Sequence, residues 1–302
     1  MRLLLTSDLH QQNQKWKLLV QAVKVEKPDW VFIAGDLLPK EPFTLANQRD
    51  FFQHIERYLT EIKDFGIEEV FTYLGNDDLH PLEYELNRLG VAGLCRNMNQ
   101  RVLRPDDSLY TVAGMAKVRS HPFGYHYHCH PDGSHILNPV LFTKPCTVND
   151  SGRWIVIDDP EAYMKAKPQI GQMLESLEWQ IPAVDAPNAI YMVHQPPALC
   201  GMDICGTGAQ VGSPTVLTFI ERTQPLLTLH GHIHESPYQP AGRWHQQIGR
   251  THAIQAGQLG TKLHYVVANV DTLLSHVGPR QHKIIRLAWH HSRSPQPEIL
   301  EF

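Results

Sequence analysis

The stretch LLLTSDLH, residues 3–10, joins a short apolar run to two polar side chains that can bind a metal ion. The apolar part, residues 3–7, has the composition of a buried β-strand. Asp8 and His10 are two positions apart, so an extended backbone would direct both to the same side. Taken alone, the pair is better explained by Asp8 capping the next helix, with His10 at the surface. The remaining sequence decides between these interpretations.

Apolar runs and helical stretches alternate along the first third of the chain. We expect strands at residues 3–7, 29–34 and 69–74, and helices at residues 15–26 and 45–65. Strands separated by helices in this way form a parallel sheet with right-handed crossovers. Ligands bind such sheets beyond the carboxyl ends of the strands. Asp8, Asp36 and Asn76 all lie at such positions.

The rest of the chain is expected to belong to the same single domain, which spans residues 1–302. Residues 117–153 contain many His, Pro, Gly and aromatic residues with weak periodicity, so we expect an insertion or cap beside the core. Its alternating His126, His128 and His130 are expected in a solvated loop. The other expected elements are strands at 110–115, 189–193 and 226–229, helices at 161–178 and 214–222, and late antiparallel strands at 251–255, 263–270 and 283–289.

The composition excludes several classes of protein. Hydrophobic residues make up 42% of the 302 residues and charged residues 19%, which indicates a folded core and not disorder. A formal net charge of −4 argues against nucleic acid as a partner, because binding it favours a basic excess. The N-terminal apolar run is too short for a signal peptide, no window reaches the length of a membrane span, and the five scattered cysteines do not resemble a disulfide framework. We therefore expect a cytoplasmic protein without a membrane partner.

Seven potential metal ligands stand at or just past the ends of predicted strands. They are Asp8, His10, Asp36, Asn76, His194, His232 and His234. Individually, Gly35-Asp36 reads as a turn, Asn76 as part of a helix cap and His194 as a core histidine. The order and position of the whole set are hard to explain by chance. Two carboxylates, one amide and four imidazoles can hold two divalent cations around a shared carboxylate, which is an arrangement that hydrolyses phosphate esters with a metal-bound hydroxide.

This pattern resembles the calcineurin-like metallophosphoesterase superfamily from Asp8 to His234. The stretch from His194 through residues 211–213 to 231–235 is similar to small prokaryotic members of the type that includes cyclic-nucleotide phosphodiesterases. Residues 254–258 fall where that family has a further segment at the edge of the active site. The resemblance implies an α/β fold, a four-layer α/β/β/α sandwich of two mixed sheets.

The resemblance also implies how the ligands divide between two metals. Asp8, His10, Asp36 and His234 would hold one metal, and Asp36, Asn76, His194 and His232 would hold the second. Oxygen and nitrogen donors without a thiolate suit manganese, iron, zinc or cobalt. A hydroxide bridging the metals would attack phosphorus in line. Asn76 and His194 are the expected substrate contacts, with Asn76 stabilising charge on the phosphate oxygens.

The chain departs from the family where the leaving group would be protonated. Many members have Gly-Asn-His-Asp or Gly-Asn-His-Glu where this chain has Gly75-Asn76-Asp77-Asp78, and the supporting Asp of some branches corresponds to Pro39. Asp77 could act only as a protonated carboxylic acid, which two nearby cations disfavour. His80, or a histidine of residues 121–135, is therefore the expected proton donor. The alternative is that leaving groups of low pKa depart without an acid.

We interpret the chain as a phosphoric ester hydrolase that acts on a small-molecule phosphodiester, with a cyclic nucleotide as the first choice, or on a phosphomonoester. A nuclease is less favoured because there is no basic excess. A protein phosphatase is less favoured because the Asp-His pair is missing. The alternative from another class is a non-catalytic metal-binding or protein-docking module on the same fold. The sequence leaves the oligomeric state open, and Cys200 and Cys205 are expected to be ordinary thiols.

Overall fold

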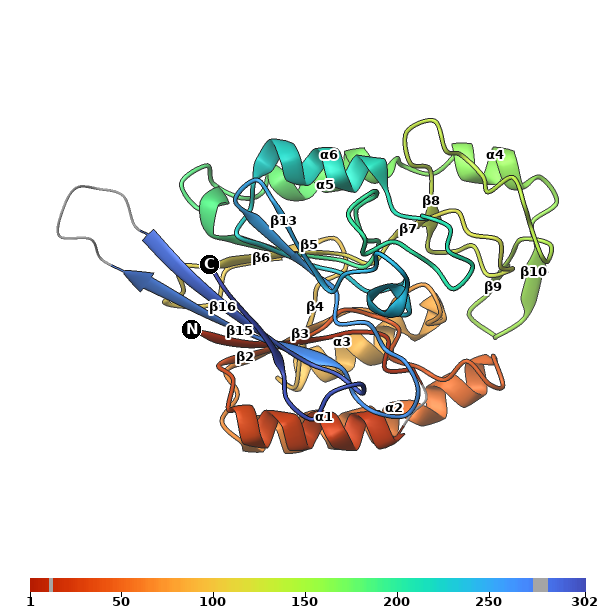
Figure 1. Cartoon of the computed structure of the whole chain (residues 1–302). Coiled ribbons are helices and arrows are strands. Elements are labelled where there is room, and N and C mark those ends of the chain that lie inside the picture. Colours follow the sequence, from red (N-terminus) through yellow and green to blue (C-terminus); the bar gives the residue numbers. More distant parts are fainter. Residues whose placement is uncertain (11–12, 274–281) are drawn as a thin grey trace.

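Two β-sheets lie face to face between two layers of helices (Figure 1). The computed structural model describes residues 1–10, 13–273 and 282–302. The helices packed on the first sheet lie at the bottom of the view and those on the second sheet at the top. The expected four-layer α/β/β/α sandwich of mixed sheets is confirmed.

The first sheet has a parallel half and an antiparallel half. Its strand order is β17-β16-β15-β1-β2-β3-β4. β1 to β4 run parallel, as expected from the strand–helix alternation, and β15, β16 and β17 add antiparallel neighbours on the other side of β1. The strands are β1 (Arg2–Thr6), β2 (Trp30–Ile33), β3 (Glu69–Thr72), β4 (Arg96–Asn97), β15 (Tyr265–Leu273), β16 (His282–His290) and β17 (Glu298–Glu301).

The second sheet has four parallel strands with an antiparallel strand at each edge. Its order is β13-β14-β12-β11-β6-β5. The strands are β5 (Arg101–Leu103), β6 (Thr111–Met115), β11 (Ala189–Val193), β12 (Leu227–Leu229), β13 (His245–Ile248) and β14 (Thr251–Ile254). The expectation that residues 251–255 form an antiparallel strand was wrong, because β14 runs parallel to β12. β13 and β14 form a tight antiparallel hairpin at the edge of the sheet. Because the edge strand β13 runs against the central strands, the chain reverses in the hairpin and β14 runs with them.

Alternation along the central strands divides their side chains between layers. In β1, Leu4 packs with the helices of the first layer, whereas Leu3 and Leu5 belong to the core between the sheets. Each fully buried leucine of this kind contributes roughly 1.5–3 kcal/mol through removal from water. A third core lies between the second sheet and its helices, where Tyr191 packs against Phe219. These three cores account for the four layers.

The helices agree with expectation at residues 15–26, 45–65 and 214–222, differ at 161–178, and include one at 83–91 that was not expected. They are α1 (Asn13–Glu26), α2 (Leu45–Asp64), α3 (Glu83–Val91), α4 (Pro160–Lys165), α5 (Ile170–Glu178) and α6 (Pro214–Thr223), with short 3-10 turns at His80–Leu82, Ala186–Asn188 and Ser236–Tyr238. The single helix expected at 161–178 was wrong, because Pro168 separates α4 from α5. Proline lacks the N–H that a helix interior needs and restricts the residue before it. Within the described part of the chain, no helix is long and apolar enough to cross a membrane.

The segment expected to form an insertion projects from one end of the sandwich (Figure 1). It contains two small sheets, formed by β7 (Val118–Arg119) with β8 (Cys129–His130) and by β9 (Cys146–Val148) with β10 (Trp154–Val156). His126, His128 and His130 are only 0, 3 and 7% exposed, so the expectation of a solvated loop was wrong. The Nζ of Lys167 donates to the backbone carbonyls of residues 126, 127 and 129, at 2.9, 2.7 and 2.9 Å, and holds this segment folded on itself.

Candidate functional site

Loops at the carboxyl ends of five strands, three from the first sheet and two from the second, carry the seven predicted ligands. Asp8 and His10 follow β1, Asp36 follows β2, Asn76 follows β3, His194 follows β11, and His232 and His234 follow β12. Contacts described below connect each of them to at least one other. The two sheets therefore bring together residues as far apart in sequence as 8 and 234.

Four of these residues have an unusual backbone conformation. The φ angles of Asp8, His10, Asp36 and His232 are 52, 43, 53 and 69°, in the left-handed region that side chains other than glycine rarely adopt. Such conformations cost of order 1–3 kcal/mol each and concentrate at functional sites. Their clustering at the strand ends supports a functional role for these loops.

Two glycines allow the loops to approach one another closely. A Cβ atom on Gly75 would overlap the backbone nitrogen and side-chain oxygen of Asp36. A Cβ atom on Gly231 would lie 2.8 Å from Oδ2 of Asp8 and 3.0 Å from Nδ1 of His194. Any side chain at either position would push apart residues that face each other across the site.

One half of the site converges on the side chain of Asn76. Nε2 of His194 lies 3.0 Å and Nδ1 of His232 lies 2.6 Å from Asn76 Oδ1. Nδ1 of His194 lies 2.8 Å from the carbonyl of Ala34, which fixes its proton there and turns Nε2 toward the site. Nε2 of His194 is also 3.3 Å from Asp36 Oδ2.

The His194–Asp36 pair is charged in the metal-free protein. Burial lowers the pKa of His194, but the Asp36 carboxylate outweighs this effect and raises it to about 9. Burial likewise raises the pKa of Asp36, but His194 holds it well below its ordinary value. The site thus keeps Asp36 as a carboxylate and attracts positive charge to its side chain.

The other half of the site contains Asp8, His10 and Asp36, whose ligand atoms all lie within 4.8 Å of one another. Asp8 accepts hydrogen bonds from the Ser7 hydroxyl at 2.5 Å and from the backbone N–H of His232 at 3.0 Å. Both ring nitrogens of His10 are buried without a hydrogen-bond partner among the described residues, and burial lowers the pKa of His10 to about 4. A neutral imidazole offers a lone pair, and the two carboxylates beside it offer negative charge. The three side chains together are therefore suited to bind a metal cation, which would also satisfy the buried ring nitrogen. The ring of His234 meets that of His10 edge-on at 5.6 Å.

Two residues that the sequence did not single out hold the ligand loops in place. The carboxylate of Asp78, fully buried, accepts the backbone N–H groups of Leu37, Leu38 and Gly75 at 3.0, 2.8 and 2.8 Å. Gln48, fully buried on α2, donates to the carbonyls of residues 39 and 77 and accepts from the N–H of residue 79. A glutamine at an apolar position of an amphipathic helix was the available signal for Gln48.

Asp77, which stands where many family members have histidine, lies beside Lys40. Its backbone N–H donates to Asp36 Oδ1 at 2.8 Å, and its carboxylate forms an ion pair with the Lys40 ammonium group. Burial lowers the pKa of Lys40, but Asp77 and Asp36 outweigh burial and raise it above its ordinary value. The Lys40 side chain is therefore held as an ammonium group beside Asp77 and Asp36.

His80 contacts the insertion. Its Nδ1 lies 3.0 Å from the Tyr125 hydroxyl, and its ring stacks on Tyr127 with 3.5 Å between centroids. Burial lowers the pKa of His80 to about 4. The insertion reaches the site itself through His121, whose ring centroid is 6.1 Å from that of His232.

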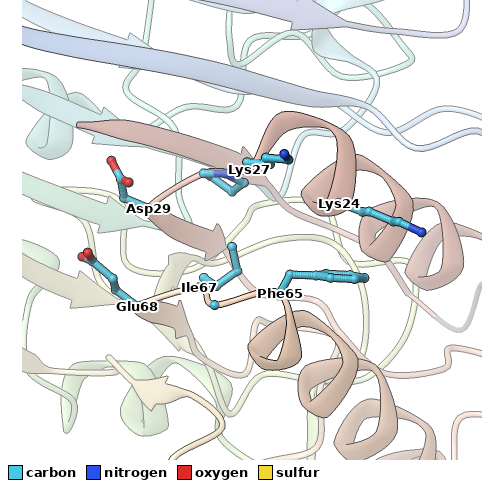
Figure 2. Close-up of a pocket in the computed structure, with 8 residues that line it drawn as sticks. Lys24, Lys27, Asp29, Phe65, Ile67 and Glu68 are labelled. Carbon is cyan, nitrogen blue, oxygen red and sulfur yellow. The ribbon is translucent and has the colours of Figure 1, made fainter.

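A separate hollow lies at the opposite, amino ends of β2 and β3 (Figure 2). Its volume is about 520 Å³, and Lys24, Lys27, Asp29, Phe65 and Glu68 are among the residues that line it. Asp29 accepts the backbone N–H of Arg2 at 2.7 Å, and Glu68 accepts the indole N–H of Trp30 at 3.1 Å. These carboxylates serve the structure, so the strand-end loops are the better candidate site.

The chain belongs to the calcineurin-like phosphoesterase family, whose model matches residues 1–236. The fold is similar to a dimetal phosphatase from Danio rerio, with a TM-score of 0.55 and 12% identity, covering 100% of this chain and 98% of that one. It is also similar to the protein TT1561 of Thermus thermophilus, with a TM-score of 0.52 and 17% identity, covering 88% of this chain and 92% of that one. Such low identities establish the fold alone. No curated protein sequence matches the chain.

Proposed function

We propose that the protein is a dinuclear metal-dependent phosphoesterase that hydrolyses a small-molecule phosphodiester, of the cyclic-nucleotide type, or a phosphomonoester. The observation that best supports this is the convergence on Asn76, where two imidazole nitrogens approach one amide oxygen at 3.0 and 2.6 Å. Loops of both sheets thereby surround one point with donors suited to a divalent cation.

The proposed ligands divide into two sets that share Asp36. One cation would be held by Asp8, His10, Asp36 and His234, and the other by Asp36, Asn76, His194 and His232. When bound, the two cations would supply Lewis acidity toward phosphoryl oxygen and lower the pKa of water. The oxygen and nitrogen donors suit manganese, iron, zinc or cobalt.

The residues around the ligands favour an anionic substrate. Asn76 and His194 are the proposed contacts to the phosphate group. Without Lys40, the carboxylate of Asp77 would repel a phosphate, whereas the ion pair cancels that charge. The preference for a diester rests on the sequence similarity of residues 194–235 to phosphodiesterases.

Proton donation to the leaving group is the part of the reaction with competing candidates. The Asp77 carboxylate is taken up in an ion pair with Lys40, an arrangement that offers no proton to a leaving group. His80 and the histidines of residues 121–135 remain the proposed donors, and departure without an acid is the alternative. Burial lowers the pKa of His80 to about 4, so His80 can donate only when a bound phosphate anion raises that pKa. Rates of His80→Gln on aryl and alkyl phosphates separate these cases. If His80 donates the proton, the alkyl ester loses activity by about 100-fold or more while the aryl ester loses little.

Metal-loaded protein assayed with bis-p-nitrophenyl phosphate and p-nitrophenyl phosphate tests the proposal. Asp36→Asn and His232→Gln should each lose most turnover and also bind less metal. Asp50→Asn, which changes an exposed carboxylate on α2, should match the unmodified protein in both measurements.

The absence of turnover with manganese, cobalt, zinc and iron would refute an enzyme and favour the alternative, a non-catalytic metal-binding or docking module. A nuclease and a protein phosphatase are less favoured, because the net charge is −4 and the Asp-His pair is missing. Five free cysteines fit a reducing compartment, so the cytoplasm is part of the proposal.

A further inference from the structure

A second group of potential metal ligands lies in the insertion. His121, His126 and Cys129 are 7, 0 and 0% exposed, and their ligand atoms all lie within 4.8 Å of one another. The group offers two imidazoles and a thiol, whereas the strand-end site offers only oxygen and nitrogen. The two sites therefore have different metal preferences.

The spacing of the rings matches that of two imidazoles on one ion. With Zn–N distances of about 2.0–2.1 Å and tetrahedral angles, two bound imidazoles have ring centroids roughly 5 Å apart. The centroids of His121 and His126 are 5.2 Å apart. Nitrogen and sulfur ligands of one zinc lie about 3.3–3.7 Å from each other, so ligand atoms within 4.8 Å would move together by at most about 1.1–1.5 Å.

The imidazoles are oriented for ligation. Nδ1 of His126 lies 2.9 Å from the carbonyl of Gly124, which places its proton there. Its Nε2 lone pair then accepts only a long hydrogen bond, 3.4 Å, from the Ser120 hydroxyl, which a metal ion would replace. Nε2 of His121 is buried without a partner among the described residues. Its Nδ1 accepts one long hydrogen bond, 3.3 Å, from the N–H of Phe123, and that bond would give way on ligation through either nitrogen.

The surroundings of Cys129 stabilise a thiolate once a metal is present. The backbone N–H of His121 hydrogen-bonds to the sulfur, and positive charge on the nearby Lys167 amino group, whose own pKa burial lowers to about 7, favours the thiolate. Burial nevertheless raises the pKa of Cys129 to about 12, so the metal-free protein holds a thiol. Binding would exchange the thiol proton for the metal, forming one S–Zn bond and releasing one proton to solvent.

We propose that His121, His126 and Cys129 bind one zinc ion, with a water molecule beside Ser120 as the fourth ligand. The insertion has little apolar core of its own. Among the described residues, the buried members of its hydrophobic cluster are Val118, Cys129 and Met164. A bound metal stabilises segments of this kind by holding them together. Since His121 also faces His232, the ion fixes the wall of the insertion beside the phosphoesterase site and removes His121 and His126 from the candidate proton donors.

Cobalt substitution tests the proposal without relying on activity. Metal-stripped full-length protein titrated with Co²⁺ should develop a near-ultraviolet sulfur-to-cobalt charge-transfer band, which the strand-end site cannot give. The band should disappear in Cys129→Ser and persist in Cys95→Ser, a control that changes another buried thiol, 2% exposed. Relative to the unmodified protein, the zinc content should fall by one ion per chain in Cys129→Ser and stay unchanged in Cys95→Ser.

X-ray absorption of the zinc-loaded, unmodified protein covers the case in which Cys129→Ser does not fold. A sulfur neighbour at about 2.3 Å is expected. Zinc surrounded only by oxygen and nitrogen, or a charge-transfer band that persists in folded Cys129→Ser, would overturn the zinc site. Either result leaves the phosphoesterase proposal untouched, because that proposal depends on turnover and on Asp36.

Discussion

Replacing Gln48 with leucine removes a fully buried amide that joins two ligand loops. The amide donates to the carbonyls of Pro39 and Asp77, both at 2.9 Å, and accepts the N–H of Leu79 at 2.8 Å. Three buried backbone groups lose their partner at about 1–2 kcal/mol each, which sums to about 3–6 kcal/mol. Leucine recovers roughly 1–2 kcal/mol through its greater apolarity. We expect Gln48→Leu to lower the free energy of unfolding by about 1–5 kcal/mol.

The assay is urea unfolding of metal-free protein, which keeps metal affinity out of the comparison. The midpoint should fall while the m-value stays constant, because the surface exposed on unfolding is unchanged. Gln53→Leu is the matched control, since Gln53 is exposed on the same helix, and its effect should stay within about 0.5 kcal/mol. A loss below about 1 kcal/mol for Gln48→Leu, or equal losses for the two variants, would show that this amide does not tie the loops together.

Three further changes test other parts of the structure. Gly75→Ala introduces a Cβ that overlaps Asp36, so metal affinity measured by titration should fall about 10–100-fold, and unchanged affinity would contradict the close approach of the loops. Lys167→Met leaves three backbone carbonyls without their donor and should destabilise the protein by roughly 2–4 kcal/mol in urea, whereas a neutral effect would show that the carbonyls find water instead. Burial lowers the pKa of His252 to about 4, below the 6.5 of the unfolded chain. Stability should therefore fall as pH drops from 6.5 toward 4, by at most about 1.4 kcal/mol per pH unit from this residue. Thermal melts of His252→Phe should show a correspondingly weaker pH dependence.

The positions and ends of the long central strands were predictable from local patterns, whereas the short strands β4, β5, β13 and β17 and those of the insertion were not expected. Parallel strands end at the same edge of a sheet, so side chains directly after β1, β2 and β3 had to meet whatever the details of packing. The structure brings Asp8, Asp36 and Asn76 together at that edge, and their role as metal ligands stays a prediction. The direction of β14 and the break at Pro168 were missed, because the first depends on a hairpin and the second on a residue inside an otherwise helical pattern.

The sequence by itself determined the class of fold and the order of the candidate ligands, since residue type and strand polarity are local properties. Only the tertiary structure decided which groups face one another across the site. The Lys40–Asp77 ion pair joins residues 37 positions apart, Gln48 reaches three backbone groups of neighbouring loops, and the insertion buries His121 beside His232. Such contacts depend on how the layers and the insertion pack. Burial then keeps a histidine such as His121 neutral and leaves one of its ring nitrogens without a hydrogen-bond partner among the described residues.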